Sequence, residues 1–367
     1  MENLDVSIKR GQIHLQMEDG LKDPVVHCTG PLNQSVEGSL LRLEATSRQI
    51  LDVNVIMPST VRHLNLHLES GTARITDISI DTADINVGNG AVLSGNISGQ
   101  WDMNIGRGEL TIEGGKGSFD LNAGMGSVHL QSVDNSTADI NAGMGSVRLE
   151  HSQGTFDINA GKGDVTVDNF GGKIKVNAGL GKIILTKGRN VDCELESGMG
   201  SITLYEGLFR RAQLLTGNGQ IEVHARVEAL TAKASMRGDI NIEIPDDLSC
   251  RIEASTDLGR IISHLDLVEV NNPGPTRGHR LVGQIGTKTH GVIYLKTRKG
   301  NISLAQYPAL PTLIDPVPSS TQEDDPRSLI LEKLQKGIIT VDEASVLLDR
   351  LESDTHGRQP KQHSEPG

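Results

Sequence analysis

The sequence predicts an all-β chain, a parallel β-helix or solenoid with coils of 18–19 residues, followed by a small C-terminal α-helical hairpin. Three observations predict this fold: a Gly-x-Gly motif returns at a fixed interval, apolar residues alternate on both sides of it, and the composition changes after Leu304. The second glycines fall at 90, 108, 126, 145, 163, 181, 200 and 219, in steps of 18 or 19 residues. A fixed period of this size is typical of repeat architectures, whose units pack on their neighbours.

One unit illustrates the expected geometry. Phe119 and Leu121 precede the motif at 124–126, and Val128 and Leu130 follow it, which is the period-2 pattern of half-buried strands. Leu121 and Val128 are seven positions apart, so on one straight strand they would face opposite sides. Because both positions are apolar in almost every unit, we expect the motif to break the strand and turn the chain, with glycine supplying the dihedral angles.

The predicted turn glycines of the central units are Gly124, Gly126, Gly143, Gly145, Gly161, Gly163, Gly179 and Gly181. A corner that repeats once per unit favours stacked coils with strands in parallel register. A β-prism or a sandwich of G-x-G hairpins remains an alternative, because the pattern alone does not define strand order.

The domain boundaries follow from changes in composition. We expect a β-solenoid over residues 1–305 with irregular first coils in 1–65, a surface loop from Asn271 to Gly291, and a Pro-rich linker over 306–325. Residues 326–353 carry the helical hairpin, and 354–367 form a polar, disordered tail. The hairpin residues Leu334, Ile338, Leu347 and Leu351 are more apolar surface than two short helices can cover, which predicts self-association or docking on a protein partner.

Composition excludes several classes of function. A formal net charge of −12 argues against nucleic-acid binding, and eight aromatic residues are too few for stacking on bases. Each G-x-G motif leads into a strand and not into a helix, so the motifs do not predict a nucleotide cofactor. There is no HExxH zinc motif and no GxSxG nucleophile elbow. The sequence therefore predicts no cofactor and no enzyme.

Two polar columns alternate with the expected core positions and should face outward on one strand. The aspartates four residues before the first glycine are Asp84, Asp102, Asp120, Asp139 and Asp157. The asparagines two residues before it are Asn86, Asn104, Asn122, Asn141, Asn159 and Asn177. One interpretation is an acidic stripe that binds divalent cations or a cationic peptide, which makes the aspartates weak candidate metal ligands. The other is a structural ladder of asparagine amides with solvated aspartates beside it.

The units around Asn141–Val147 and the strands that end at Pro58 and Pro245 resemble the bacterial "putative-adhesin" domain of unknown function with G-x-G β-strand repeats. This resemblance covers most of residues 40–305. Residues 331–344 resemble the short helical SHOCT-like module, and the pairing is similar to bacterial proteins linked to the cell-envelope stress response. The resemblance implies a β-helical fold without known catalysis and offers no catalytic residues.

The resulting expectation is a non-enzymatic structural or interaction scaffold linked to envelope stress. A surface adhesin and a β-helical enzyme acting on polysaccharide are the alternatives. The N-terminus lacks the basic and apolar regions of a signal peptide, and no 18-residue apolar run is present. We therefore expect no membrane-spanning segment and a cytoplasmic location, with a membrane-peripheral position as a further alternative.

Overall fold

The computed structural model describes residues 1–45, 49–269, 278–286 and 291–308. The chain divides into a unit from Met1 to Ala309 and a second unit from Leu310 to Gly367. The predicted hairpin and tail, and the predicted linker from residue 309 onward, lie outside the described residues. The first unit is built from β-strands alone in the part that the structure describes.

Five strands form the N-terminal end of this unit: β1 (Asn3–Glu18), β2 (Val25–Cys28), β3 (Asn33–Glu37), β4 (Leu40–Ala45) and β5 (Leu51–Pro58). The central coils contain β6 (His63–Met144), β7 (Val147–Glu150), β8 (Gln153–Lys162), β9 (Val165–Asp168), β10 (Gly171–Leu180), β11 (Ile183–Met199), β12 (Ile202–Asn218) and β13 (Ile221–Arg237). The C-terminal end contains β14 (Ile240–Pro245), β15 (Cys250–Leu258), β16 (Ile261–Ser263), β17 (Val268–Glu269), β18 (His279–Ile285), β19 (Gly291–Lys299) and β20 (Ile302–Tyr307).

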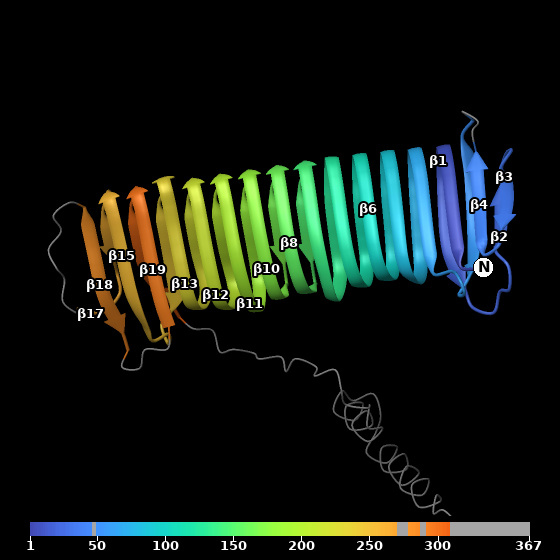
Figure 1. Cartoon of the computed structure of the whole chain (residues 1–367). Coiled ribbons are helices and arrows are strands. Elements are labelled where there is room, and N and C mark those ends of the chain that lie inside the picture. The colour runs from blue at the N-terminus through green and yellow to red at the C-terminus, as the bar shows by residue number, and fades with distance from the viewer. Residues whose placement is uncertain (46–48, 270–277, 287–290, 309–367) are drawn as a thin grey trace, which may run out of the picture. The chain divides into compact units, whose positions relative to one another are not determined.

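The strands stack as a parallel solenoid, and the coils lie side by side along the unit (Figure 1). In the central coils a strand residue pairs with the one 18 or 19 positions away in the next coil: Ile158 pairs in parallel with Ile140 on one side and with Val176 on the other. All three side chains are fully buried. The predicted solenoid and its buried column are confirmed, and the hairpin sandwich is wrong because the central coils pair in parallel.

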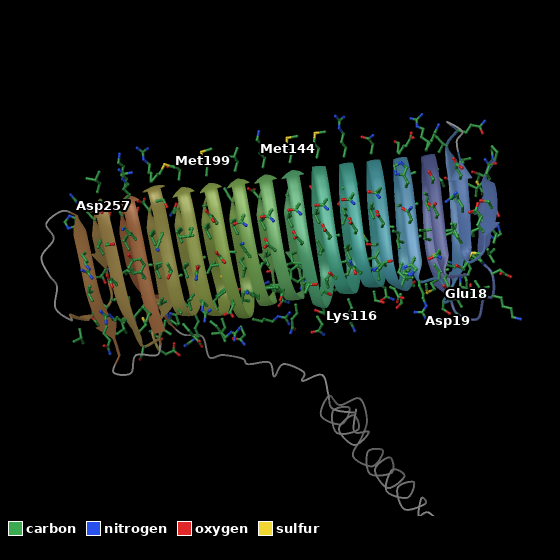
Figure 2. All side chains as sticks on the ribbon, viewed as in Figure 1. Glu18, Asp19, Lys116, Met144, Met199 and Asp257 are labelled. Atoms are coloured by element: carbon green, nitrogen blue, oxygen red, sulfur yellow. The ribbon has the colours of Figure 1, made fainter. Side chains whose placement is uncertain are left out.

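Each coil has two faces joined by two corners. The first face contains the residues before the G-x-G motif, the second face those after it, and the motif itself forms the glycine corner. Figure 2 shows Met144 and Met199 at this corner and Lys116 at the opposite one. Within β6, which spans 82 residues, the chain turns at several corners without interruption of the strand, so the expected break is wrong for the motifs that β6 contains. From the motif at 143–145 onward the break is present, since β6 ends at Met144 and β7 begins at Val147. Residues on both sides of the motif are buried as expected.

Glycine is required at this corner by the backbone of the preceding coil. A Cβ atom added at Gly163 would overlap the carbonyl oxygen of Gly145, and one added at Gly124 would lie 2.8 Å from the carbonyl oxygen of Gly106. Gly163 also has a φ of +149°, which residues with a side chain rarely adopt. The glycines therefore let successive corners stack backbone on backbone.

At the opposite corner the chain turns through residues in the left-handed conformation. One column of residues at this corner adopts the left-handed conformation, and glycine occupies the column only once; Asn135 and Asn190 also adopt this conformation in their coils. The column contains Asp77, Asn96, Gly114, Ser132, His151, Asn169, Lys187 and Glu206, with φ between +49° and +80°. Glycine adopts this conformation freely, Asn and Asp tolerate it better than other residues with a side chain, and Ser132, His151, Lys187 and Glu206 each cost about 1 kcal/mol. The stacking of neighbouring coils holds these strained turns in place.

One apolar core runs from Leu4 to Leu304 between the two faces. It is built mainly from aliphatic side chains, and its largest members are Trp101, Phe119, Phe156, Phe170 and Phe209, all fully buried. Phe156 and Phe170 pack edge to face, with ring centroids 5.4 Å apart. The few aromatic rings of the chain thus serve mostly in packing.

The two ends depart from chain order. Near the N-terminus, β1 lies between β4–β5 and β6, and the antiparallel strands β2 and β3 pair with β5 and β4 on the outside. Near the C-terminus, β19 lies between β13 and β15, and β20 lies between β14 and β16. The antiparallel strand β18 closes that end against β15. The expected surface loop at 271–291 is therefore wrong over β18.

Candidate functional site

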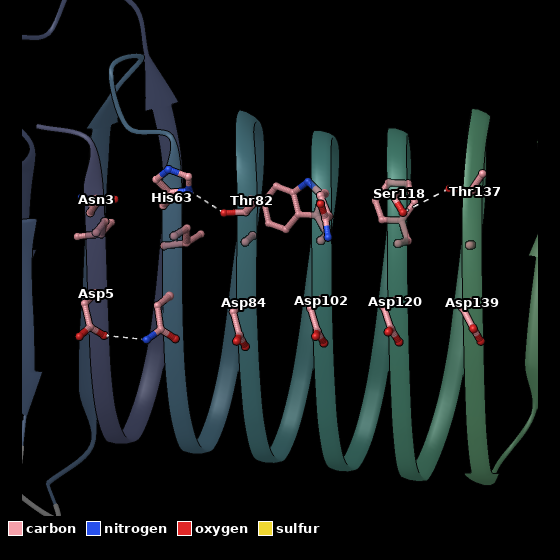
Figure 3. A pocket seen from close by; sticks show the side chains of 18 of the residues that line it. Asn3, Asp5, His63, Thr82, Asp84, Asp102, Ser118, Asp120, Thr137 and Asp139 are labelled. Atoms are coloured by element: carbon pink, nitrogen blue, oxygen red, sulfur yellow. Dashed lines mark hydrogen bonds between the residues drawn. The ribbon is translucent and has the colours of Figure 1, made fainter.

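The five predicted aspartates form a straight row on the first face. Asp84, Asp102, Asp120 and Asp139 are exposed, and Asp157 is half-buried. Figure 3 shows the first four in line, one per coil, with Asp5 at the N-terminal end of the row. The sequence analysis did not include Asp5, because the coil that contains it lacks the G-x-G motif.

The row borders an open groove of about 840 Å³. The groove has a second polar wall, which the sequence analysis missed, and this wall includes Thr82, Gln100, Ser118, Thr137 and Thr155. Between the walls lies an apolar floor that includes Ala83, Trp101, Phe119 and Ala138. Alignment of the repeat could have revealed the second wall, since these residues precede the buried floor position in every coil.

The asparagine ladder is present and supports the aspartates. The side-chain amide of Asn122 donates to the Asn104 side-chain oxygen at 3.0 Å and to Asp120 Oδ1 at 2.9 Å. The ladder continues coil by coil to Asn177. Asn122 and Asn141 thus donate both to the asparagine of the preceding coil and to the aspartate of their own coil, whereas Asn86 and Asn104 donate to their aspartates and Asn159 and Asn177 to the preceding asparagine. One carboxylate oxygen is used in this way, and the other is left to face the groove.

Charge compensation in this row is confined to its ends. Asp5 pairs with Arg42 at 3.2 Å, and Asp157 lies 4.0 Å from Lys175 Nζ. Among the described residues, the four aspartates from Asp84 to Asp139 have no ion pair. Partial burial raises the pKa of Asp102, the hydrogen bond from Asn104 opposes this rise, and the charges of Asp120 and Asp84 add to it. The middle of the row is thus an uncompensated line of negative charge.

The row does not form a metal cage. No group of three or more His, Cys, Asp or Glu side chains could hold a metal ion in the part of the chain that the structure describes. Neighbouring aspartates are separated by one coil, about 4.8 Å, and each is held to its own asparagine. The arrangement can attract cations, but it does not converge on one point as a coordination sphere requires.

A second polar cluster, also missed from the sequence, lies on the second face. The ring of His224 stacks between Tyr205 and Tyr307, with centroid distances of 5.1 and 4.3 Å. Its Nδ1 lies 2.7 Å from Glu243, and Arg226 pairs with Asp247 beside it. Burial raises the pKa of Tyr307, Arg226 opposes the rise, and Asp247 and Glu243 add to it. This cluster joins β20 to the coils of β12 and β13.

The structure places the predicted turn glycines at the glycine corner, whereas Leu334, Ile338, Leu347 and Leu351 lie outside the described residues. Across the described ranges, no helix has the length and apolar character needed to cross a membrane.

Comparison with known proteins gives a family. A protein-family model described as Toastrack DUF4097 matches residues 121–305, just over half of the chain. A crystal structure of a "putative cell adhesion protein" from Clostridium sporogenes is similar over 83% of this chain and 93% of that chain, with 10% sequence identity and a TM-score of 0.18. That TM-score is too low to support an inference from one protein to the other. No curated protein matches the chain.

Proposed function

The chain belongs to the Toastrack DUF4097 family, and on that premise we propose that it is a non-catalytic binding scaffold whose acidic groove holds an extended cationic peptide. The acidic groove is the open groove between the aspartate row and the wall of Thr, Ser and Gln side chains. The proposal rests on the aspartates from Asp84 to Asp139, which have no ion-pair partner among the described residues. A carboxylate that was buried or already paired with a cation would attract a cationic ligand much less.

The shape of the groove favours a polymer over a compact molecule. Its lining extends from Asp5 to Asp157 across seven successive coils, which corresponds to about 29 Å at about 4.8 Å per coil. An extended peptide advances about 3.3 Å per residue, so roughly nine residues would span the row. Lysine or arginine side chains could reach the free carboxylate oxygens, while the backbone lies beside the hydroxyl wall.

Divalent cations are the weaker ligand class for this row, because the carboxylates stand in line. The polysaccharide-enzyme alternative is also weak, because all four phenylalanines and the single tryptophan are buried and the exposed ring of Tyr205 is stacked on His224. The alternative of a surface adhesin predicts secretion of the protein. The link to envelope stress belongs to this proposal through the resemblance described above, and the cytoplasmic location through the N-terminal sequence and the missing apolar run.

The proposed scaffold has a second contact region. The predicted hairpin at 326–353 would join copies of the chain or a protein partner, since its apolar residues exceed what two short helices can cover. The acidic groove would then be displayed in several copies, which strengthens binding to a long ligand through effective concentration.

The test is a titration of the full chain with fluorescent decalysine at low salt. Asp102→Asn, Asp120→Asn and Asp139→Asn together should weaken binding roughly 3- to 100-fold, because each exposed ion pair contributes about 0.2–1 kcal/mol. The matched control is Glu113→Gln, Glu206→Gln and Glu222→Gln, which neutralises three exposed acids outside the groove. Equal losses in both variants would show that only net charge matters and would contradict the proposal.

A further inference from the structure

A ridge of side chains runs along the glycine corner. It consists of the middle residue of each motif from 106–108 onward and the equivalent residues of the last coils, and its members follow one another in successive coils. In spatial order this corner ridge contains Arg107, Met125, Met144, Lys162, Leu180, Met199, Asn218, Arg237, Lys299 and Leu258.

The apolar members of the ridge protrude into solvent. Met144 is 49% exposed, Met199 54% and Leu258 64%. In the central coils a glycine lies on each side of the ridge residue, so no neighbouring side chain in the same coil covers it. Met236 adds another exposed methionine beside Arg237. A continuous row of large, half-exposed apolar side chains is unfavourable in water, and such a surface usually marks a site that another molecule covers.

The charges on the ridge are of one sign. Arg107, Lys162, Arg237 and Lys299 are interspersed among the apolar residues, and no acid occupies the ridge in a protein of net charge −12. The nearest acids are Asp257, which directly precedes Leu258, and the acids one position beyond the second glycine of a motif. Two of them are held against the next coil, since Asp164 accepts a hydrogen bond from the Lys182 amide and Asp239 from the Asn301 amide.

The opposite corner supplies an internal comparison. Its left-handed column contains aspartate, glutamate, asparagine, serine, histidine, glycine and one lysine, Lys187, and no large apolar residue. The same coils thus produce one polar edge of mixed charge and one apolar edge whose charges are cationic, so the difference is not a general property of solenoid corners.

We propose that the corner ridge docks on an anionic lipid surface. Apolar side chains interleaved with lysine and arginine are the pattern of proteins that lie in a membrane interface, where the apolar groups enter the acyl boundary and the cations reach the lipid phosphates. The ridge from Arg107 to Leu258 is straight and about 43 Å long at about 4.8 Å per coil, which suits a flat surface. Flexible methionines adapt to such an environment.

The acidic remainder of the protein does not prevent this contact. Screening limits repulsion between exposed charges to about 8 Å at physiological salt, so the lipid surface senses mainly the ridge itself. The acidic groove lies on the first face and the ridge at a corner, so both can be occupied at once. The inference is independent of the ligand proposed for the groove.

The experiment is flotation of the full chain with vesicles of phosphatidylglycerol and phosphatidylcholine in equal parts, and with phosphatidylcholine alone. We expect binding to the anionic vesicles that weakens with added salt. Met144→Ser, Leu180→Ser and Met199→Ser together should reduce the bound fraction at least 10-fold. Circular dichroism and the decalysine titration should be unchanged in this variant, which shows that the fold and the groove remain intact.

The matched control replaces three exposed apolar residues away from the ridge, Ile262→Ser, Val268→Ser and Val292→Ser. This variant should bind vesicles as the parent does. Absence of vesicle binding by the parent, or an equal loss in both variants, would overturn the proposal. Self-association of the parent that the ridge variant alone loses, without vesicle binding, would overturn it in favour of a protein partner.

Discussion

The glycine corner provides a stringent test of the stacked fold. In Gly163→Ala, the new methyl group would overlap the Gly145 carbonyl oxygen and would lie 3.1 Å from the Ser146 amide nitrogen. To relieve the overlap, the two coils must separate by about 1 Å or more, which exceeds the range of a hydrogen bond. Two backbone hydrogen bonds join the coils here, from the Gly145 amide to Lys162 at 2.9 Å and from the Val147 amide to Asp164 at 3.0 Å.

The magnitude follows from these contacts. Loss of two hydrogen bonds costs about 2 kcal/mol, and alanine at a φ of +149° costs about 1–3 kcal/mol. The reduced entropy of the unfolded chain returns about 0.4–1 kcal/mol. We therefore expect Gly163→Ala to destabilise the protein by about 2–4 kcal/mol, measured by urea unfolding followed by circular dichroism.

The control is Gly95→Ala, because a Cβ atom there meets nothing closer than 3.7 Å. It should be neutral or slightly stabilising. Hydrogen exchange adds spatial resolution, since coils in a repeat protein can open locally: exchange at Val147 should accelerate in Gly163→Ala. If Gly163→Ala and Gly95→Ala unfold at the same urea concentration, the backbone stacking described for this corner is refuted.

Three further predictions concern charge, metal and the C-terminal segment. The folded-state pKa of Asp102 is raised, so its charge destabilises the fold at neutral pH, and this cost disappears as the pH falls through that pKa. Asp102→Asn should therefore raise the urea midpoint of unfolding at pH 7 and have less effect near pH 4. An equal shift of the midpoint at both pH values would contradict this reasoning. Millimolar calcium should leave the melting temperature unchanged, and a rise abolished by removal of the aspartates would restore the metal interpretation. A chain that ends at residue 308 should keep its β-type circular dichroism but lose self-association in light scattering, and an unchanged mass would refute the role proposed for residues 326–353.

Most of the solenoid could be predicted because one steric requirement recurs in every central coil. The glycine corner requires the same residue type each time, so Gly124 and Gly126 carry a visible period. The opposite corner was invisible, because the left-handed position accepts Asp77, Ser132 or Lys187 and therefore has no single residue signature. The stacking of neighbouring coils imposes its conformation, and this stacking leaves no pattern in the local sequence.

The order of the terminal coils could not be predicted for a related reason. Similar repeats do not indicate which copy pairs with which, and β19 pairs with β13 and β15 through ordinary alternating strands. The closing strand β18 was hidden within a segment rich in glycine. In the candidate site, the spacing of the repeat indicated the aspartates. The groove beside them depends on the packing of the side chains that form its floor, and the spacing does not report that packing.

The central claim is that the acidic groove binds an extended cationic chain along the aspartate row, and the most direct measurement is affinity as a function of peptide length. Oligolysines of 3 to 15 residues are titrated into the full chain at constant salt. The groove from Asp5 to Asp157 predicts affinity that rises with length and levels off near nine residues, where the row of carboxylates ends. Affinity that keeps rising in proportion to peptide charge, or that is indifferent to length, would contradict the account.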